Sequence, residues 1–185
     1  MQKLRQMEAK PLKIIREFAG QYNINWRILY AILMCESNAR GLEREQIKTR
    51  FEPHIYSGFA TVKDRMMNHH AALPALDAAW IRGHTYTQLR WMSTSWGIAQ
   101  IMGWHYPMLG YKTIDDMMEA YKASEELQVR SFCLFCVKYR DGKFLTALKK
   151  MDIKAISKMY NGAGYKRNNY DVKLVKNFQG IENEG

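Results

Sequence analysis

Helical periodicity dominates the hydrophobic pattern of this chain, and the strict alternation typical of half-buried strands is scarce. The first predicted helix covers residues 4–19 and ends near Gly20. The second covers residues 26–37, because the side-chain oxygen of Asn25 can accept a hydrogen bond from a free amide of its first turn. The pattern therefore opens with two consecutive helices.

The pattern then becomes less regular. Residues 40–60 are predicted to be irregular, with a short strand around 47–51. One or two shorter helices are predicted within residues 61–92. These features indicate a mainly helical protein with at most a small β element.

Capping residues mark the helices of the second half. Thr113 and Ser124 are each followed by acidic residues, which suit the positive end of a helix dipole. The helix after Ser124 is predicted to run to about Arg140, before Asp141-Gly142. Further predicted elements follow in order: a helix from Asp152 to about Tyr160, a turn at 161–164 and a helix over 170–178.

Length and composition suit one folded domain over residues 1–185. The chain has 185 residues, of which 47% are hydrophobic, and this is enough for a substantial core. No apolar run approaches the ~18 residues that a membrane helix needs, so no stable membrane insertion is predicted. Lys3 and Arg5 are followed by neither an apolar stretch nor a small-residue cleavage site. We therefore expect no signal peptide and synthesis in a cytoplasm.

The net charge of +10 predicts an anionic partner, which could be nucleic acid, anionic lipid or a bacterial wall polymer. Charge alone does not choose among these. Cys133 and Cys136 fall in an apolar helical stretch, and no second pair completes a zinc site, so they are expected to be small core residues. His69-His70 and His84 lack metal-ligand spacing. We predict neither a metal nor a cofactor.

One carboxylate stands out. Ile28, Ile32 and Glu36 are spaced by four and so share a helix face, which places Glu36 at the end of an apolar stripe. Partial burial and the negative end of the helix dipole should both raise the pKa of this carboxyl. A carboxyl that stays protonated near neutral pH is what a glycosidase needs to protonate a leaving oxygen. The alternative is a frayed helix end with Glu36 in water.

Three further segments accompany Glu36. They are Phe51-Glu52-Pro53-His54-Ile55-Tyr56, then Ser95 to Gly103 (SWGIAQIMG), then Tyr160 to Tyr165 (YNGAGY) followed by Asn169-Tyr170-Asp171. In this order, from about residue 12 to 178, they closely resemble the N-acetylmuramidase family of phage endolysins. More widely, Glu36-Ser37, Gly97 to Gln100 and Tyr160-Asn161 are similar to lytic transglycosylases and goose-type lysozymes. The long stretch between Glu36 and Gln100 departs from the transglycosylase pattern and favours the muramidases.

The resemblance implies a lysozyme-like helical fold with a glycan-binding cleft. It implies that Glu36 is the general acid for the bond between N-acetylmuramic acid and N-acetylglucosamine. Glu52 is the candidate second catalytic carboxylate, as base or charge stabiliser, or else a structural acid bonded to backbone amides or to Arg50. Ser95 and Gln100 are expected to line the cleft and bind substrate.

The last segment is expected to contribute two more substrate-binding residues. The Tyr160 hydroxyl should bond to Glu36 or to the substrate, beside Asn161; the alternative is a packed tyrosine before a turn. Gly97 and Gly103 are expected to allow close backbone approach or a left-handed turn rather than to contact substrate.

The expected partner is bacterial peptidoglycan, with no nucleic acid, and the protein is expected to be a monomer. The resemblance also implies release to the wall by a pore-forming, holin-type partner. Competing hypotheses are a lytic transglycosylase that releases anhydro-muramic products, and a non-catalytic cationic protein that binds walls or membranes. A nucleic-acid binder rests on charge alone.

Overall fold

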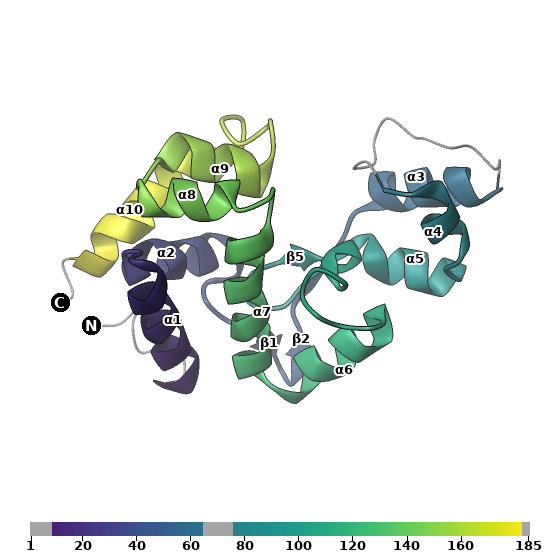
Figure 1. The fold of residues 1–185 in the computed structure, drawn as a ribbon, viewed down its shortest axis with the longest axis horizontal. Coiled ribbons are helices and arrows are strands. Elements are labelled where there is room, and N and C mark those ends of the chain that lie inside the picture. Colours follow the sequence, from purple (N-terminus) through teal and green to yellow (C-terminus); the bar gives the residue numbers. More distant parts are fainter. Residues whose placement is uncertain (1–8, 65–75, 183–185) are drawn as a thin grey trace.

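The computed structural model describes residues 9–64 and 76–182, and it is mainly helical (Figure 1). The helices are α1 (Ala9–Tyr22), α2 (Trp26–Ser37), α3 (Pro53–Asp64), α4 (Ala78–Arg82), α5 (Tyr86–Met92), α6 (Ile114–Ala123), α7 (Glu125–Lys138), α8 (Lys143–Lys149), α9 (Ile153–Asn161) and α10 (Tyr170–Glu182), with a 3₁₀ turn at Gly103–His105. The strands are β1 (Leu42–Glu43), β2 (Gln46–Ile47), β3 (Thr49–Phe51), β4 (Thr94–Trp96) and β5 (Ile101–Met102). The predicted mainly-α fold class is confirmed.

Two groups of helices lie on either side of the short strands (Figure 1). In the first group α10 packs against α2 and α9, while α7 packs against α1 and α8. In the second group α3 packs against α4 and α5. The strands pair in the antiparallel order β3-β4-β5, beside a separate β1-β2 hairpin. This small sheet connects the two groups of helices.

The predicted caps are confirmed. Asn25 accepts from the amide of Arg27, and Asp152 accepts from the amide of Ala155. Thr113 forms a reciprocal capping box, and Ser124 accepts from the second amide of α7. Each of these side chains satisfies a backbone donor that the helix itself cannot.

Several predicted boundaries were wrong. Helix α1 continues through Gly20 to Tyr22, because the chain turns only at Asn23, which has a left-handed φ of 53°. The predicted start of this helix, at residues 4–8, lies outside the described residues. Helix α7 ends at Lys138 rather than Arg140, since Arg140 already has a φ of 53°.

Two helices were missed. Most of α3 falls within residues 40–60, which were expected to be irregular, and the helix begins at Pro53 because proline suits a first helical position. Helix α8 is short and begins after Gly142, whose left-handed φ of 78° starts it without a side-chain cap. The one or two short helices predicted over 61–92 are found as α4 and α5. Residues 65–75, which precede α4 and include His69-His70, lie outside the described part.

Close packing explains two glycines, as predicted. Gly97 has a φ of 72°, and a Cβ there would lie 2.6 Å from Oε1 of the buried Gln128. That oxygen accepts from the Ile98 amide at 2.8 Å. A Cβ on Gly103 would lie 2.4 Å from the Trp91 carbonyl oxygen. Both glycines therefore let other groups approach the backbone.

The cysteines of α7 are core residues, as predicted. Cys133 and Cys136 are buried and unbridged, and burial raises the pKa of the Cys133 thiol to about 12. Among the described residues, no three His, Cys, Asp or Glu side chains come together as metal ligands would. None of the described helices is both long and apolar enough to cross a membrane.

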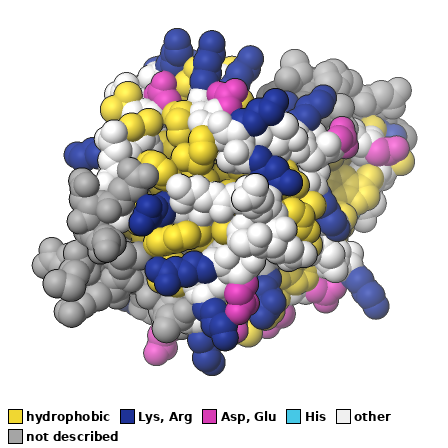
Figure 2. All heavy atoms as spheres, turned by 60° about the vertical axis from the view of Figure 1, so that its left-hand side comes forward, with side chains coloured by type: hydrophobic (Ala, Val, Ile, Leu, Met, Phe, Trp, Pro, Cys, Tyr) yellow, Lys and Arg dark blue, Asp and Glu magenta, His cyan; other side chains and the backbone are white. Residues whose placement is uncertain are grey.

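Basic side chains are spread over the surface. On the face seen in Figure 2, Lys and Arg outnumber Asp and Glu without forming one block. The C-terminal helices and the turn before α10 carry exposed cations at Lys149, Lys150, Lys154, Lys158, Lys166, Arg167, Lys173 and Lys176. Such a surface attracts anionic polymers in a salt-sensitive way.

Candidate active site

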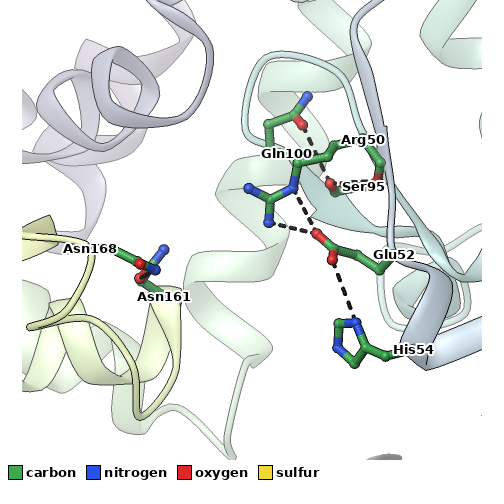
Figure 3. Close-up of polar contacts among 7 residues, drawn as sticks. All are labelled: Arg50, Glu52, His54, Ser95, Gln100, Asn161 and Asn168. Atoms are coloured by element: carbon green, nitrogen blue, oxygen red, sulfur yellow. Dashed lines mark hydrogen bonds and ion pairs between the residues drawn. The ribbon is translucent and has the colours of Figure 1, made fainter.

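A cleft lies between the small sheet and the turn that joins α9 to α10. It consists of two adjoining cavities of about 600 and 390 Å³. The first reaches Glu36 at the end of α2, and the second reaches Glu52. The residues that line both cavities, and so join them, are Arg50, Gln100, Met102, Tyr160 and Asn161. Figure 3 shows Arg50 and Gln100 on one wall and Asn161 on the other.

Glu36 is partly buried at the last turn of α2. The Tyr170 hydroxyl donates a hydrogen bond of 2.6 Å to its Oε1. Burial raises the pKa of the Glu36 carboxyl from 4.5 to about 7, against the smaller opposing effects of the Tyr170 hydrogen bond and the positive charge of Arg50. The Glu36 carboxyl therefore keeps its proton to a higher pH than a solvated glutamate does. The frayed, solvated helix end is not what the structure shows.

Ser37 ties the end of α2 to the sheet. Its buried hydroxyl donates to the Ile98 carbonyl at 2.6 Å, and the Lys48 ammonium donates to the Ser37 carbonyl at 3.1 Å. Asn38 then ends the helix in the left-handed conformation. These contacts fix the last turn, and with it Glu36, against the turn between β4 and β5.

Glu52 is paired with Arg50 across the end of β3. The Arg50 Nε donates to Glu52 Oε1 at 2.7 Å, and Nη2 lies 2.6 Å from the same oxygen. His54 Nδ1 lies 3.8 Å from Oε2 (Figure 3). A carboxylate bonded to Arg50 is one of the two roles that the sequence left open for Glu52.

Ser95 and Gln100 hold the sheet together as well as lining the first cavity. The buried Ser95 hydroxyl lies 3.2 Å from the Arg50 carbonyl oxygen and 3.3 Å from Gln100 Oε1. The Gln100 amide nitrogen donates to the carbonyls of Lys48 and Gly97. These contacts also stabilise the left-handed φ of 48° at Gln100. Ser95 and Gln100 therefore both stabilise the β4-β5 turn and its pairing with the preceding strand.

Tyr160 lines both cavities, but its hydroxyl does not bond to Glu36, which was one of its two expected partners. Its hydroxyl donates to the Ala99 carbonyl at 2.6 Å, and the hydroxyl that meets Glu36 is that of Tyr170. The two rings are stacked with their centroids 6.4 Å apart, so the ring of Tyr160 packs against that of Tyr170. Asn161 lines the cleft and accepts a hydrogen bond of 2.9 Å from the Asn168 amide.

Tyr170 belongs to the segments that carry the sequence resemblance, but no role beside Glu36 was predicted for it. It begins the buried face of α10, which continues through Leu174 to Ile181 and packs on α2. Because α10 packs on α2, this position places the Tyr170 hydroxyl beside Glu36. Burial and the neighbouring Glu36 hold the pKa of Tyr170 well above its ordinary value, so the hydroxyl remains a donor.

Comparison with known proteins decides the family. The family model for N-acetylmuramidase matches residues 76–182, which is more than half of the chain. The chain belongs to the N-acetylmuramidase family. A solved structure described as the crystal structure of Burkholderia AP3 phage endolysin is similar, with a TM-score of 0.68 and 23% identity over 92% of this chain and 69% of that one. No curated protein matches the chain.

As a muramidase, the protein is a glycoside hydrolase of the lysozyme type that acts on peptidoglycan. The structural similarity confirms the lysozyme-like, mainly helical fold. The matched part of the muramidase includes Ser95, Gln100, Tyr160 and Asn161, whereas Glu36 and Glu52 precede it. The sequence resemblance was expected to begin near residue 12, well before the matched range. The assignment of Glu36 and Glu52 to the site therefore depends on the geometry of the cleft.

The far end of the muramidase cleft is aromatic. The second cavity is lined by Trp104, His105, Phe135 and Tyr139, among others. The rings of Phe135 and Tyr139 are stacked at 4.3 Å, and burial lowers the pKa of His105 to about 4, so its ring is neutral. Flat apolar rings suit the apolar faces of sugars. Beyond Glu36, the second cavity therefore presents the partly exposed rings of Trp104, His105 and Tyr139.

Proposed function

We propose that this muramidase is an endolysin that cleaves the bond between N-acetylmuramic acid and N-acetylglucosamine, with Glu36 as general acid. The observation that carries the proposal is a carboxyl with a pKa of about 7, which lines the cleft and is held by Tyr170. Because Tyr170 donates to Oε1, the acidic proton belongs on Oε2, where it can pass to the bridging oxygen.

The surroundings of Glu36 also support loss of that proton. When the proton passes to the leaving oxygen of the glucosamine, Glu36 becomes a carboxylate while positive charge develops on the muramic acid carbon. Tyr170 and Arg50 both lower the pKa of Glu36, which means that both stabilise this carboxylate. Water then completes the cleavage at the muramic acid carbon.

We assign the other cleft residues as follows. Gln100 and Asn161 bind polar groups of the glycan, since amides can both donate and accept. Ser95 and Tyr160 support them, because their hydroxyls are bonded to backbone carbonyls. Glu52 acts through Arg50 rather than as a base, since its Oε1 is occupied by that guanidinium.

We also propose that residues 1–185 act as one catalytic domain and as a monomer. The wall is the site of action, and a holin-type pore-forming partner would give access to it. The similarity to a phage endolysin supports this part of the proposal.

One observation keeps lytic transglycosylation as a second candidate. Among the described residues that line the first cavity, Glu36 is the single carboxylic acid. Transglycosylases need one such acid, which acts first as acid and then as base. The products of the reaction separate these two chemistries.

The test is digestion of purified peptidoglycan by the wild type and by Glu36→Gln, with fragments reduced by borohydride and identified by mass spectrometry. Glu43→Gln is the matched control, because Glu43 is an exposed carboxylate on β1. We expect reduced muramic acid ends from the wild type and the control, and their loss in Glu36→Gln.

Each other result has a definite meaning. Anhydro-muramic ends would assign the reaction to transglycosylation. Equal digestion by Glu36→Gln would remove Glu36 from the mechanism. No fragments from the wild type would favour the non-catalytic cationic protein.

A further inference from the structure

Arg50 lies at the junction of the two cavities, and a contribution to stability does not explain why its side chain is held in one orientation. Its side chain is 75% exposed, and its ion-pair partner Glu52 is 19% exposed. Ion pairs as open to water as this one contribute little to stability. Figure 3 shows the guanidinium on the cleft side of the pair, facing the wall that carries Asn161 and Asn168.

The pairing leaves one edge of the guanidinium free. Nε and Nη2 both meet Glu52 Oε1, so one N–H edge is used. Within the described part of the chain, Nη1 makes no hydrogen bond, and the end formed by Nη1 and Nη2 is the fork that binds a carboxylate through two parallel bonds. Glu52 therefore orients Arg50 for an anionic group in the cleft.

The charge around Arg50 also favours an anion. Lys48 and Lys173 line the first cavity, where Glu36 is the single acidic side chain among the described lining residues. Arg140 lines the second cavity together with Glu52. Low-dielectric walls concentrate such a field within a cleft. The combined charge attracts a negatively charged section of a strand.

A wall strand carries its negative charge unevenly. Its two sugars alternate, and only the muramic acid carries a lactyl group, which ends in a carboxylate or continues into a stem peptide with carboxylates of its own. A residue that binds this carboxylate therefore distinguishes one sugar from the other. It also determines which of the two alternating bonds lies beside Glu36.

We infer that Arg50, oriented by Glu52, is a specificity-determining residue that binds a carboxylate on the muramic acid and thereby sets the register of the strand. This inference rests on the proposed function, and it names the feature of the substrate that the cleft recognises. The carboxylate belongs either to the lactyl group or to the stem peptide, and both present the same chemistry to Arg50.

Binding to inactive protein tests this independently of cleavage. Glu36→Gln and the double variant Glu36→Gln/Arg50→Gln are titrated with soluble glycan strands, either native or with their carboxylates converted to neutral amides. Neutralisation of the strand carboxylates is expected to weaken binding about tenfold in Glu36→Gln, because the charged hydrogen bond to Arg50 is lost. It should weaken binding little in the double variant, which already lacks that bond. Glu36→Gln/Lys158→Gln is the matched control, since Lys158 is an exposed cation outside both cavities.

The source of the carboxylate is tested with two kinds of strand. Strands stripped of peptides by an amidase retain only the lactyl carboxylate, whereas intact strands carry those of the stem. The dependence on Arg50 should appear on stripped strands if the lactyl group binds, and on intact strands alone if the stem binds. Equal weakening of both proteins by neutralisation, on both kinds of strand, would overturn the inference.

In the active enzyme, Arg50→Gln is expected to raise KM more than it lowers kcat and to increase the share of glucosamine reducing ends. Arg50→Lys keeps the charge without the fork and should restore binding only in part. An unchanged KM and an unchanged ratio of reducing ends would contradict the role of Arg50 while leaving that of Glu36 intact.

Discussion

Replacing Glu36 by glutamine is expected to stabilise the folded protein at neutral and alkaline pH. Burial raises the pKa of this carboxyl from 4.5 to about 7, so the folded state holds the proton more tightly than the unfolded chain. As the pH rises above 4.5, the unfolded chain releases its proton first, and this favours unfolding. Since a tenfold difference in proton affinity corresponds to about 1.4 kcal/mol, the cost reaches about 3 kcal/mol above the folded pKa.

Glutamine removes this cost without removing the contact, because its amide oxygen can still accept from Tyr170. Urea unfolding of the wild type and Glu36→Gln, at about pH 4 and about pH 8, measures the effect as a change in the free energy of unfolding. The two proteins should be equally stable in acid, and the variant should be more stable by about 3 kcal/mol in alkali.

Glu43→Gln is again the control, because this exposed carboxylate changes the net charge equally and should alter stability by less than about 0.5 kcal/mol. The reasoning is refuted if Glu36→Gln gains nothing over the wild type at alkaline pH. In that case the buried site would accommodate the ionised carboxyl without cost.

Three further predictions concern the site and its support. Tyr170→Phe removes the donor to Glu36, so it should raise the pKa of that carboxyl further and lower kcat, seen as an alkaline shift and a reduced height of the pH–rate profile. Glu52→Gln keeps an oxygen acceptor for its arginine partner and should retain more activity than Glu52→Ala; equal loss in both would restore the role of base. Gly97→Ala should destabilise by about 1–3 kcal/mol in urea unfolding, whereas Gly20→Ala, in open space on α1, should stabilise slightly.

The local features of the fold could be predicted from the sequence because local contacts create them. The caps at Asn25 and Thr113 depend on amides two or three residues away, and both were predicted correctly. Glu36 was found because residues four apart on a helix share a face. Helix α8 was missed since Gly142 begins it without a capping side chain.

The partners of Glu36 could not be predicted, because they depend on how distant elements pack. Tyr170 reaches the carboxyl only because α10 crosses α2. The Arg50 carbonyl accepts from Ser95 because β3 pairs with β4, across a long loop in the sequence. Tyr160 was expected beside Glu36, but the sequence does not say which of two nearby tyrosines points at the acid.

The most direct test of the central claim measures the proton on Glu36 and the reaction together. The claim is that Glu36 keeps its proton to near-neutral pH and donates it to the glycosidic oxygen. Carbon-13 NMR can follow the Glu36 carboxyl through a pH titration, with Glu36→Gln used to assign its resonance. The same protein then gives the pH dependence of kcat/KM on soluble glycan strands, which reports the free enzyme's essential acid. We expect the carboxyl to titrate with a pKa of about 7 and the activity to fall with the same pKa as the pH rises. A carboxyl that titrates near 4.5, or an activity that does not change as the carboxyl titrates, would contradict the role of Glu36 as general acid.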